Sequence, residues 1–286
     1  MIEVVRAGPL TTVQDLGRPG LAHLGVGRSG AADRPSLRLA NRLVGNPESA
    51  AALETTFGGL ALRFERATTV ALAGAAAPLC LDGRSRDTHA PVAVGAGQLL
   101  EVGMPRSGVR SYLAVRGGVD VEPVLGARAT DVLAHLGPEH LAEGDRLPVG
   151  ATTGPVPGVD VAPVRPISEH PVLRVVPGPR ADWFSDDALA ALGTTGFEVT
   201  SHSDRVGVRL AGAALVRRRH EELPSEGVVE GAVQVPADGQ PVVFLADHPV
   251  TGGYPVVAVV HPDDIAVAAQ LRPGRQVRFA LQPALG

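Results

Sequence analysis

Lysine is absent from this sequence of 286 residues, so its 26 strongly basic side chains are all arginine. The absence excludes a Schiff-base lysine, a phosphate-binding loop of the G-x-x-x-x-G-K-[ST] type, and biotin carried on this chain. Arginine stays protonated at any working pH, so histidine is the one basic side chain that can serve as a general base. A lysine-containing phosphate loop or a carried biotin would therefore have to come from another component.

Cysteine, long apolar runs and excess positive charge are also lacking. Cys80 is the only cysteine, which excludes an internal disulfide and a cysteine-based zinc site. Residues 1–6 do not resemble a signal peptide, and the longest apolar stretch, 70–81, is shorter than the roughly 20 residues that cross a bilayer. A net charge of −4 argues against nucleic-acid or membrane binding. We expect a cytoplasmic globular protein.

Glycine and proline are abundant, with 35 and 25 copies, which is typical of many short strands joined by turns. Alternating apolar residues predict strands at 60–64, 69–73, 98–102 and 111–115. Capping residues predict three short helices, which begin at Asp33, Ser185 and Asp263. A repeated pattern at 94–102, 141–149 and 271–279 places a glycine, expected at positive φ, before a strand. The chain is predicted to be mainly β, with two related β-rich halves and a few short helices.

The stretch 151–170 is rich in proline and cannot build a central strand or helix. It is the best candidate for a linker. We therefore expect an N-terminal β-rich subdomain at 1–150 and a C-terminal subdomain at 171–286.

Standard catalytic motifs are missing. No H-E-x-x-H is present and the nine histidines are scattered, so we expect no metal site. Residues 27–30 do not form a G-x-S-x-G nucleophile elbow, and no G-x-G-x-x-G follows a strand and opens a helix.

Two stretches gather polar side chains where the chain is irregular. The first, 12–33, sets Gln14, Asp15, Arg18, Ser29 and Asp33 among glycines, where the backbone can approach a ligand closely. Its alternative is an Asp–Arg pair that braces a loop. In the second, 203–210, Asp204 and Arg205 would either form a buried pair or hold a substrate carboxylate.

The third polar stretch, 225–255, is the densest. Two antiparallel strands at 228–235 and 242–246, joined by a turn at 236–239, carry Gln234 and lead to a polar tip. At this tip Asp247 and His248 are expected to transfer protons, and Thr251 with the Gly252 and Gly253 amides to hold an oxyanion. Tyr254 completes the predicted catalytic set. The alternative is that Asp247 and Thr251 only cap the turn and Tyr254 packs.

The same stretches carry a family resemblance. The sequence resembles the family called allophanate hydrolase subunit 2, KipA, or the C subunit of bacterial 5-oxoprolinase, from about residue 3 to 282. The matching motifs are Val13-Gln-Asp-Leu-Gly-Arg-Pro-Gly20, Ser29-Gly-Ala-Ala-Asp33, Ala40-Asn-Arg-Leu-Val-Gly-Asn46, Gly117-Gly-Val, Leu125-Gly-Ala-Arg-Ala-Thr130, Ser203-Asp-Arg-Val-Gly, Ser225-Glu-Gly and Thr251-Gly-Gly-Tyr-Pro255.

The resemblance implies a cyclophilin-like β-barrel and kinship with the carboxyltransferase part of urea carboxylase. It implies an ATP-dependent 5-oxoprolinase, formed with a KipI-like subunit (allophanate hydrolase subunit 1) and a LamB/YcsF-type subunit. ATP, with Mg²⁺, would lie at an interface or on a partner. Arg18, Arg128 and Arg205 would hold anionic groups. Where the family commonly has arginine after Asp247, this chain has His248, and serines flanking Arg128 are replaced by alanines.

Three function classes remain open. The first is the catalytic subunit just described. The second is a carboxyltransferase that acts on biotin carried by another protein. The third is a non-enzymatic regulator that binds a KipI-like kinase inhibitor.

Overall fold

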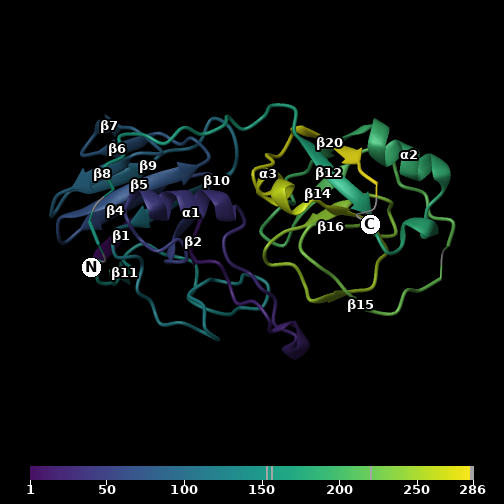
Figure 1. The fold of residues 1–286 in the computed structure, drawn as a ribbon, viewed down its shortest axis with the longest axis horizontal. Coiled ribbons are helices and arrows are strands. Elements are labelled where there is room, and N and C mark those ends of the chain that lie inside the picture. The colour runs from purple at the N-terminus through teal and green to yellow at the C-terminus, as the bar shows by residue number, and fades with distance from the viewer. Residues whose placement is uncertain (153, 156, 220, 284–286) are drawn as a thin grey trace. The chain divides into compact units, whose positions relative to one another are not determined.

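The computed structural model describes residues 1–152, 154–155, 157–219 and 221–283 (Figure 1). The chain divides into two compact units. Unit 1 holds residues 1–18, 29–131 and 135–166, and unit 2 holds residues 19–28 and 132–134 together with the chain from 167 onward. The boundary after Pro166 falls inside the proline-rich stretch 151–170, of which Thr153 and Val156 lie outside the described residues.

Unit 1 contains two antiparallel sheets and one α-helix. The first sheet has the order β11-β1-β4-β9-β6-β7 and consists of β1 (Ile2–Ala7), β4 (Leu60–Phe64), β6 (Leu79–Leu81), β7 (Arg84–Arg86), β9 (Leu99–Val102) and β11 (Arg146–Leu147). The second has the order β2-β3-β10-β5-β8 and consists of β2 (Leu10–Gln14), β3 (Ala52–Thr56), β5 (Thr68–Gly74), β8 (Pro91–Val94) and β10 (Arg110–Val115). The four predicted strands are confirmed.

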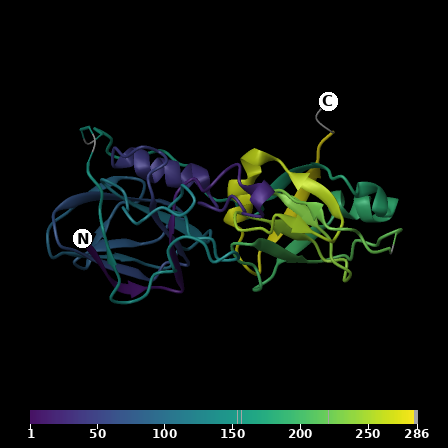
Figure 2. The same ribbon diagram turned by 90° about the horizontal axis from the view of Figure 1, so that it is seen from below.

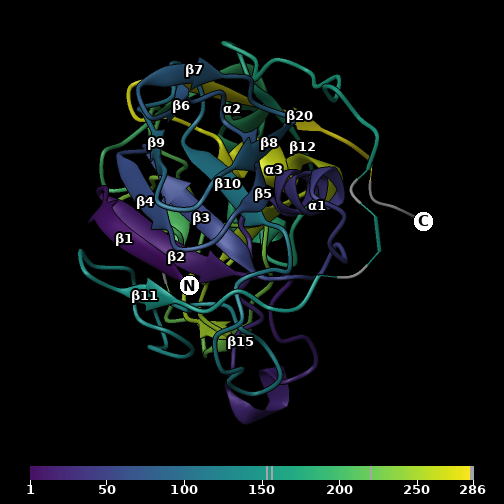
Figure 3. The ribbon, with the colours of Figure 1, turned by 90° about the vertical axis from the view of Figure 1, so that its left-hand side faces the viewer.

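The second sheet is covered on both faces. On β5, Val70 and Leu72 join a core shared with the first sheet, while Ala71 and Ala73 join a core with α1 (Arg34–Leu43). This division follows from the alternation of side chains along a strand. Figure 3 shows α1 beside β5 and β10. Asp33 caps the helix by accepting a hydrogen bond from the Ser36 amide at 3.0 Å, as its position before Pro35 predicts.

Unit 2 contains a closed barrel with the order β12-β19-β16-β17-β14-β13-β20, which the parallel pair β12 and β20 closes (Figures 1 and 2). The barrel strands are β12 (Val172–Pro177), β13 (Gly196–Val199), β14 (Gly207–Ala211), β16 (Ala232–Gln234), β17 (Val242–Phe244), β19 (Val256–Val260) and β20 (Gln276–Leu281). A separate pair consists of β15 (Glu226–Gly227) and β18 (Thr251–Gly252). The helices are α2 (Asp186–Thr194), α3 (Ile265–Ala269) and three 3-10 turns, η1 (Ala22–Leu24), η2 (Ala181–Trp183) and η3 (Pro262–Asp264).

Several predictions about local structure are confirmed. Ser185 caps α2, and the third helix begins near Asp263 and ends at Ala269, before the Pro273-Gly274 pair that would stop a helix. The glycines of the repeated pattern, Gly97, Gly144 and Gly274, have φ of 80°, 90° and 79° before β9, β11 and β20. The prediction of a mainly β chain with few short helices is confirmed. Within the described ranges, no helix is long and apolar enough to span a membrane.

Asp264 ties β12 to the short helices η3 and α3. Its carboxylate accepts hydrogen bonds from the Arg174 amide at 2.8 Å, from Nε at 2.9 Å and from Nη2 at 2.7 Å. Burial alone would raise the pKa of Asp264, but the hydrogen bonds and charge of Arg174 outweigh it. The pKa of Asp264 is therefore lowered from its ordinary value of 3.8.

We expect this carboxylate to make the stability of the barrel pH-dependent. Because the folded-state pKa is the lower one, its contribution is present above about pH 4 and is lost as the pH falls through the folded-state pKa. Asp264→Asn should lower the free energy of unfolding at pH 7 and flatten its decline in acid, as measured by urea unfolding. The control is Asp263→Asn, which removes a 75% exposed carboxylate that lies farther from Arg174, with Oδ2 3.7 Å from Nη2, and should change little. Parallel acid slopes for wild type and Asp264→Asn would contradict this expectation.

Candidate functional site

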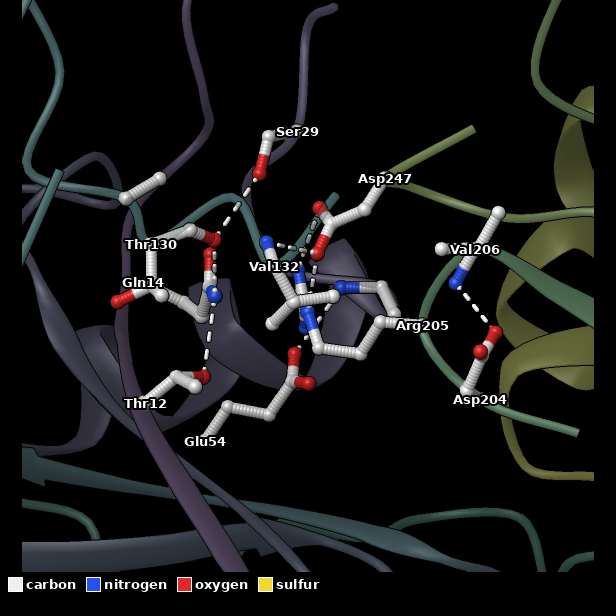
Figure 4. A network of polar contacts seen from close by, with 12 residues as sticks. Thr12, Gln14, Ser29, Glu54, Thr130, Val132, Asp204, Arg205, Val206 and Asp247 are labelled. Carbon is white, nitrogen blue, oxygen red and sulfur yellow. Dashed lines mark hydrogen bonds and ion pairs between the residues drawn. The ribbon is translucent and has the colours of Figure 1, made fainter. Parts of the chain in front are cut away.

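The first polar stretch is anchored in unit 1 on one backbone carbonyl, that of Thr130. Gln14 Nε2 donates to it at 2.9 Å and Ser29 Oγ at 3.1 Å (Figure 4). Gln14 Nε2 also donates to Thr12 Oγ1 at 3.0 Å, which fixes the orientation of the amide. All of these residues are buried. The structure therefore brings together Gln14, Ser29 and the 125–130 motif, which are far apart in sequence.

Asp15 and Arg18 brace this region, but each does so through backbone groups. Asp15 accepts from the Gly17 amide at 2.8 Å and the Arg128 amide at 2.6 Å. Arg18 donates from Nη2 to the Ala129 carbonyl at 2.6 Å and from Nε to the Val124 carbonyl at 3.3 Å. The bracing role considered for this loop is present, although its partners are main-chain atoms.

Glycine is required at one point of the stretch. Gly30 has φ of 88°, and a Cβ there would lie 2.6 Å from the Gly17 amide nitrogen. No side chain fits at that distance, so the 12–20 and 29–33 segments can pack together only through glycine.

Two buried polar atoms of this region have no hydrogen-bond partner among the described residues. They are Gln14 Oε1 and Arg18 Nη1. Gln14 is fully buried and Arg18 is 2% exposed. Such atoms are uncommon in folded proteins and mark places where a ligand or a water molecule is expected.

Arg128 differs from Arg18 in its surroundings. Its Nη2 forms an ion pair with Asp120 at 2.8 Å, its Nε donates to the Val121 carbonyl at 2.7 Å, and its side chain is 37% exposed. The charge of Arg128 is therefore already balanced within unit 1.

The Asp33 backbone joins a buried hydrogen-bond network with Tyr112 and Glu54, two residues that the sequence analysis did not predict as site residues. The Asp33 amide donates to Tyr112 Oη at 2.7 Å, and Tyr112 Oη donates to Glu54 Oε2 at 2.7 Å. The Ala32 amide also donates to Glu54, at 3.1 Å, and Arg110 Nε lies 3.5 Å from it. Burial, followed by the charge of Glu54, raises the pKa of Tyr112 well above its ordinary value. A carboxylate within the otherwise uncharged strand β3 was the sequence signal for this network.

In unit 2 the central feature is an ion pair between Arg205 and Asp247. Nε lies 2.8 Å from Oδ2 and Nη2 lies 3.1 Å from Oδ1, so the contact is bidentate (Figure 4). Each residue is 1% exposed. Asp247 also accepts a hydrogen bond from the Val132 amide at 3.1 Å. The carboxylate thus holds a guanidinium and a distant backbone segment.

This bidentate partner differs from the one that the sequence suggested, which was Asp204. Asp204 closes a turn, accepting from the amides of Val206 at 2.8 Å and Gly207 at 3.0 Å. The carboxylate that binds Arg205 belongs to Asp247, 42 positions further along the chain. Asp204 and Arg205 both lie in the turn before β14, and the turn amides already occupy the Asp204 carboxylate, which explains the difference.

His248 lies beside Asp247 in sequence but directs its ring elsewhere. Its Nδ1 lies 2.7 Å from the Pro249 carbonyl, and its ring stacks on Phe244 with centroids 5.9 Å apart. A carbonyl only accepts, so Nδ1 carries the proton and Nε2 is the basic nitrogen of the neutral ring.

The remaining residues of the third stretch form a small ordered unit. Gln234 Nε2 donates to the Tyr254 carbonyl at 2.9 Å, and a Cβ on Gly252 would lie 2.6 Å from that nitrogen. Thr251 pairs with Gly227 in the two-stranded sheet. Tyr254 is 48% exposed, and the centroid of its ring lies 5.9 Å from the Arg217 guanidinium carbon. The chemical roles given to these residues, and to Gly253, stay predictions.

The described residues contain no cluster of three or more His, Cys, Asp or Glu side chains suited to a metal ion. The site residues thus fall into two groups, one in each unit. Most of their polar atoms bind the main chain or each other. Within the part of the chain that the structure describes, Gln14 Oε1 and Arg18 Nη1 are the buried side-chain atoms of these site residues that have no hydrogen-bond partner, and Nε2 is the basic nitrogen of His248.

Two curated proteins match this chain over nearly its whole length and over most of their own. The chain is 39% identical to the C subunit of 5-oxoprolinase from Escherichia coli, over 98% of this chain and 90% of that protein. It is 32% identical to the C subunit of 5-oxoprolinase from Haemophilus influenzae over the same shares. It is also 33% identical to urea amidolyase of Saccharomyces cerevisiae, of which it spans only 16%.

The matching regions of solved structures are parts of longer chains. The crystal structure of TTHA0988 matches with a TM-score of 0.89 and 38% identity, over 98% of this chain and 55% of that one. The urea amidolyase of K. lactis matches with a TM-score of 0.90 and 30% identity, over 97% of this chain and 18% of that one. The family model described as carboxyltransferase domain, subdomains A and B, matches residues 24–281. The chain belongs to this carboxyltransferase-domain family.

Proposed function

We propose that this chain is the C subunit of an ATP-dependent 5-oxoprolinase, which opens the lactam of 5-oxoproline to glutamate as ATP is hydrolysed. The observation that carries the proposal is the 39% identity to a protein of that name over 98% of this chain and 90% of the relative. The urea amidolyase relatives match equally long segments of this chain but are several times longer.

The complex would include a KipI-like subunit and a LamB/YcsF-type subunit in the cytoplasm. Because the chain has no lysine, it cannot form a lysine-containing phosphate loop. We therefore assign ATP and Mg²⁺ to a partner or an interface.

Arg18 is the arginine best suited to an anionic oxygen of the substrate. Among the three arginines expected to bind anions, Arg205 is paired with Asp247 and Arg128 with Asp120. Arg18 contacts only carbonyls among the described residues, and its Nη1 has no partner there. A buried guanidinium without a carboxylate is costly, and an anionic ligand would offset that cost.

His248 would accept a proton from the attacking water at Nε2 and then pass that proton to the leaving amine. Its Nε2 is the basic nitrogen because Nδ1 faces the Pro249 carbonyl. Asp247, which accepts hydrogen bonds from Arg205 and Val132, would position this tip rather than exchange protons with substrate.

A carboxyltransferase acting on biotin carried in trans is the second candidate. The match to the carboxyltransferase family model over residues 24–281 favours it. Consumption of carboxylated biotin without release of ADP would support this alternative.

Reconstitution tests the proposal. The chain is combined with its KipI-like and LamB/YcsF-type neighbours, and ADP and glutamate are measured with and without 5-oxoproline. We expect equal amounts of both products, dependent on all three subunits. An assembled complex that binds the KipI-like subunit but forms no glutamate would reject the proposal in favour of the regulator.

Replacing Arg18 tests the site within that complex. Arg18→Gln should lower kcat/KM for 5-oxoproline about 100-fold, on the order of 2.7 kcal/mol of transition-state stabilisation, because a charged donor to an anionic oxygen is lost. The matched control is Arg63→Gln, which alters a half-exposed arginine in the same unit. Unchanged kcat/KM in a folded Arg18→Gln complex would remove Arg18 from the site.

A further inference from the structure

A groove of about 510 Å³ lies on the barrel of unit 2, and its lining includes none of the candidate-site residues described above. Its walls come from three segments: the turn after β13, the strand β14, and the loop that leads into β17. The turn contributes Thr200 and His202, the strand contributes Arg209, and the loop contributes Asp238 and Gln240.

The wall formed by the turn after β13 and by β14 carries hydrogen-bond donors that are not engaged elsewhere in the described residues. Arg209 has no ion-pair partner among the described residues, and His202 likewise has no polar partner there. The Thr200 hydroxyl oxygen also has none. A guanidinium, an imidazole and a hydroxyl that line the same groove suit a carboxylate.

The loop wall supplies the opposite charge. Asp238 accepts the Gln240 amide through Oδ1 at 3.0 Å, so one carboxylate oxygen is used by the turn and the charge remains. The floor includes the apolar residues Leu210, Pro236 and Pro241. A phosphate would be repelled by Asp238, whereas a ligand with both a carboxylate and an ammonium group matches both walls.

We propose that this groove binds a free α-amino acid, with its carboxylate on Arg209 and Thr200 and its ammonium on Asp238. The volume accommodates a molecule of the size of glutamate. Glutamate is the product under the proposed function, so the groove would let the subunit respond to product. The binding itself does not depend on that function.

Calorimetric titration of the full chain with L-glutamate tests the inference. We expect saturable one-site binding that Arg209→Gln weakens about tenfold or more, because charge-assisted hydrogen bonds are lost. The matched control is Arg278→Gln, an exposed arginine on the barrel strand β20, which should bind as wild type does. Equal affinity of the two variants, or no saturable binding by the wild type, would overturn the proposal.

A second comparison identifies the ammonium contact. Glutarate lacks the amine, so it should bind more weakly than L-glutamate to the wild type and equally or better to Asp238→Asn. If Asp238→Asn keeps the wild-type preference for glutamate, the assigned ligand class is wrong. These titrations use the isolated chain, so an inactive 5-oxoprolinase complex would not affect their outcome.

Discussion

The bidentate contact between Arg205 and Asp247 is the interaction on which the order of unit 2 depends. Removing two charges from water costs several kcal/mol for each, and only good geometry with further hydrogen bonds offsets that cost. Here both carboxylate oxygens face the guanidinium, and one also accepts the Val132 amide. The pair joins the turn before β14, the segment after β17 and residues 132–134 into one arrangement, next to His248.

In unit 1 buried polar side chains are also compensated by hydrogen bonds, but their partners are main-chain atoms. Gln14, Ser29, Asp15 and Arg18 satisfy backbone groups of the 125–130 motif and of their own loop. These long motifs therefore primarily stabilise the fold. What they leave unused, chiefly Arg18 Nη1 and Gln14 Oε1, is where chemistry can take place. Within one residue, the atoms that bind the backbone have a structural role, and the atoms without a partner are available for function.

The sequence predicted local structure well because local structure depends on nearby residues. The strands at 60–64 and 111–115, the cap at Asp33 and the positive φ of Gly97, Gly144 and Gly274 needed only periodicity and backbone sterics. Long-range pairing was harder. The partner of Arg205 lies 42 positions away, and Glu54 meets Tyr112 only because β3 and β10 are neighbours in a sheet. No residue pattern predicted the pairing of β12 with β20 that closes the barrel, or the groove beside Arg209, and a barrel was expected only from the family resemblance.

A double-mutant cycle on Arg205 and Asp247 tests most directly whether this pair orders unit 2. Free energies of unfolding would be measured for Arg205→Met, Asp247→Asn and the double variant by chemical denaturation. Each single change should cost about 3–5 kcal/mol because it leaves the other group buried without its partner. The double variant should cost much less than their sum, with a coupling of about 2 kcal/mol or more. Additive single costs, with a coupling below about 0.5 kcal/mol, would contradict the central role of the pair.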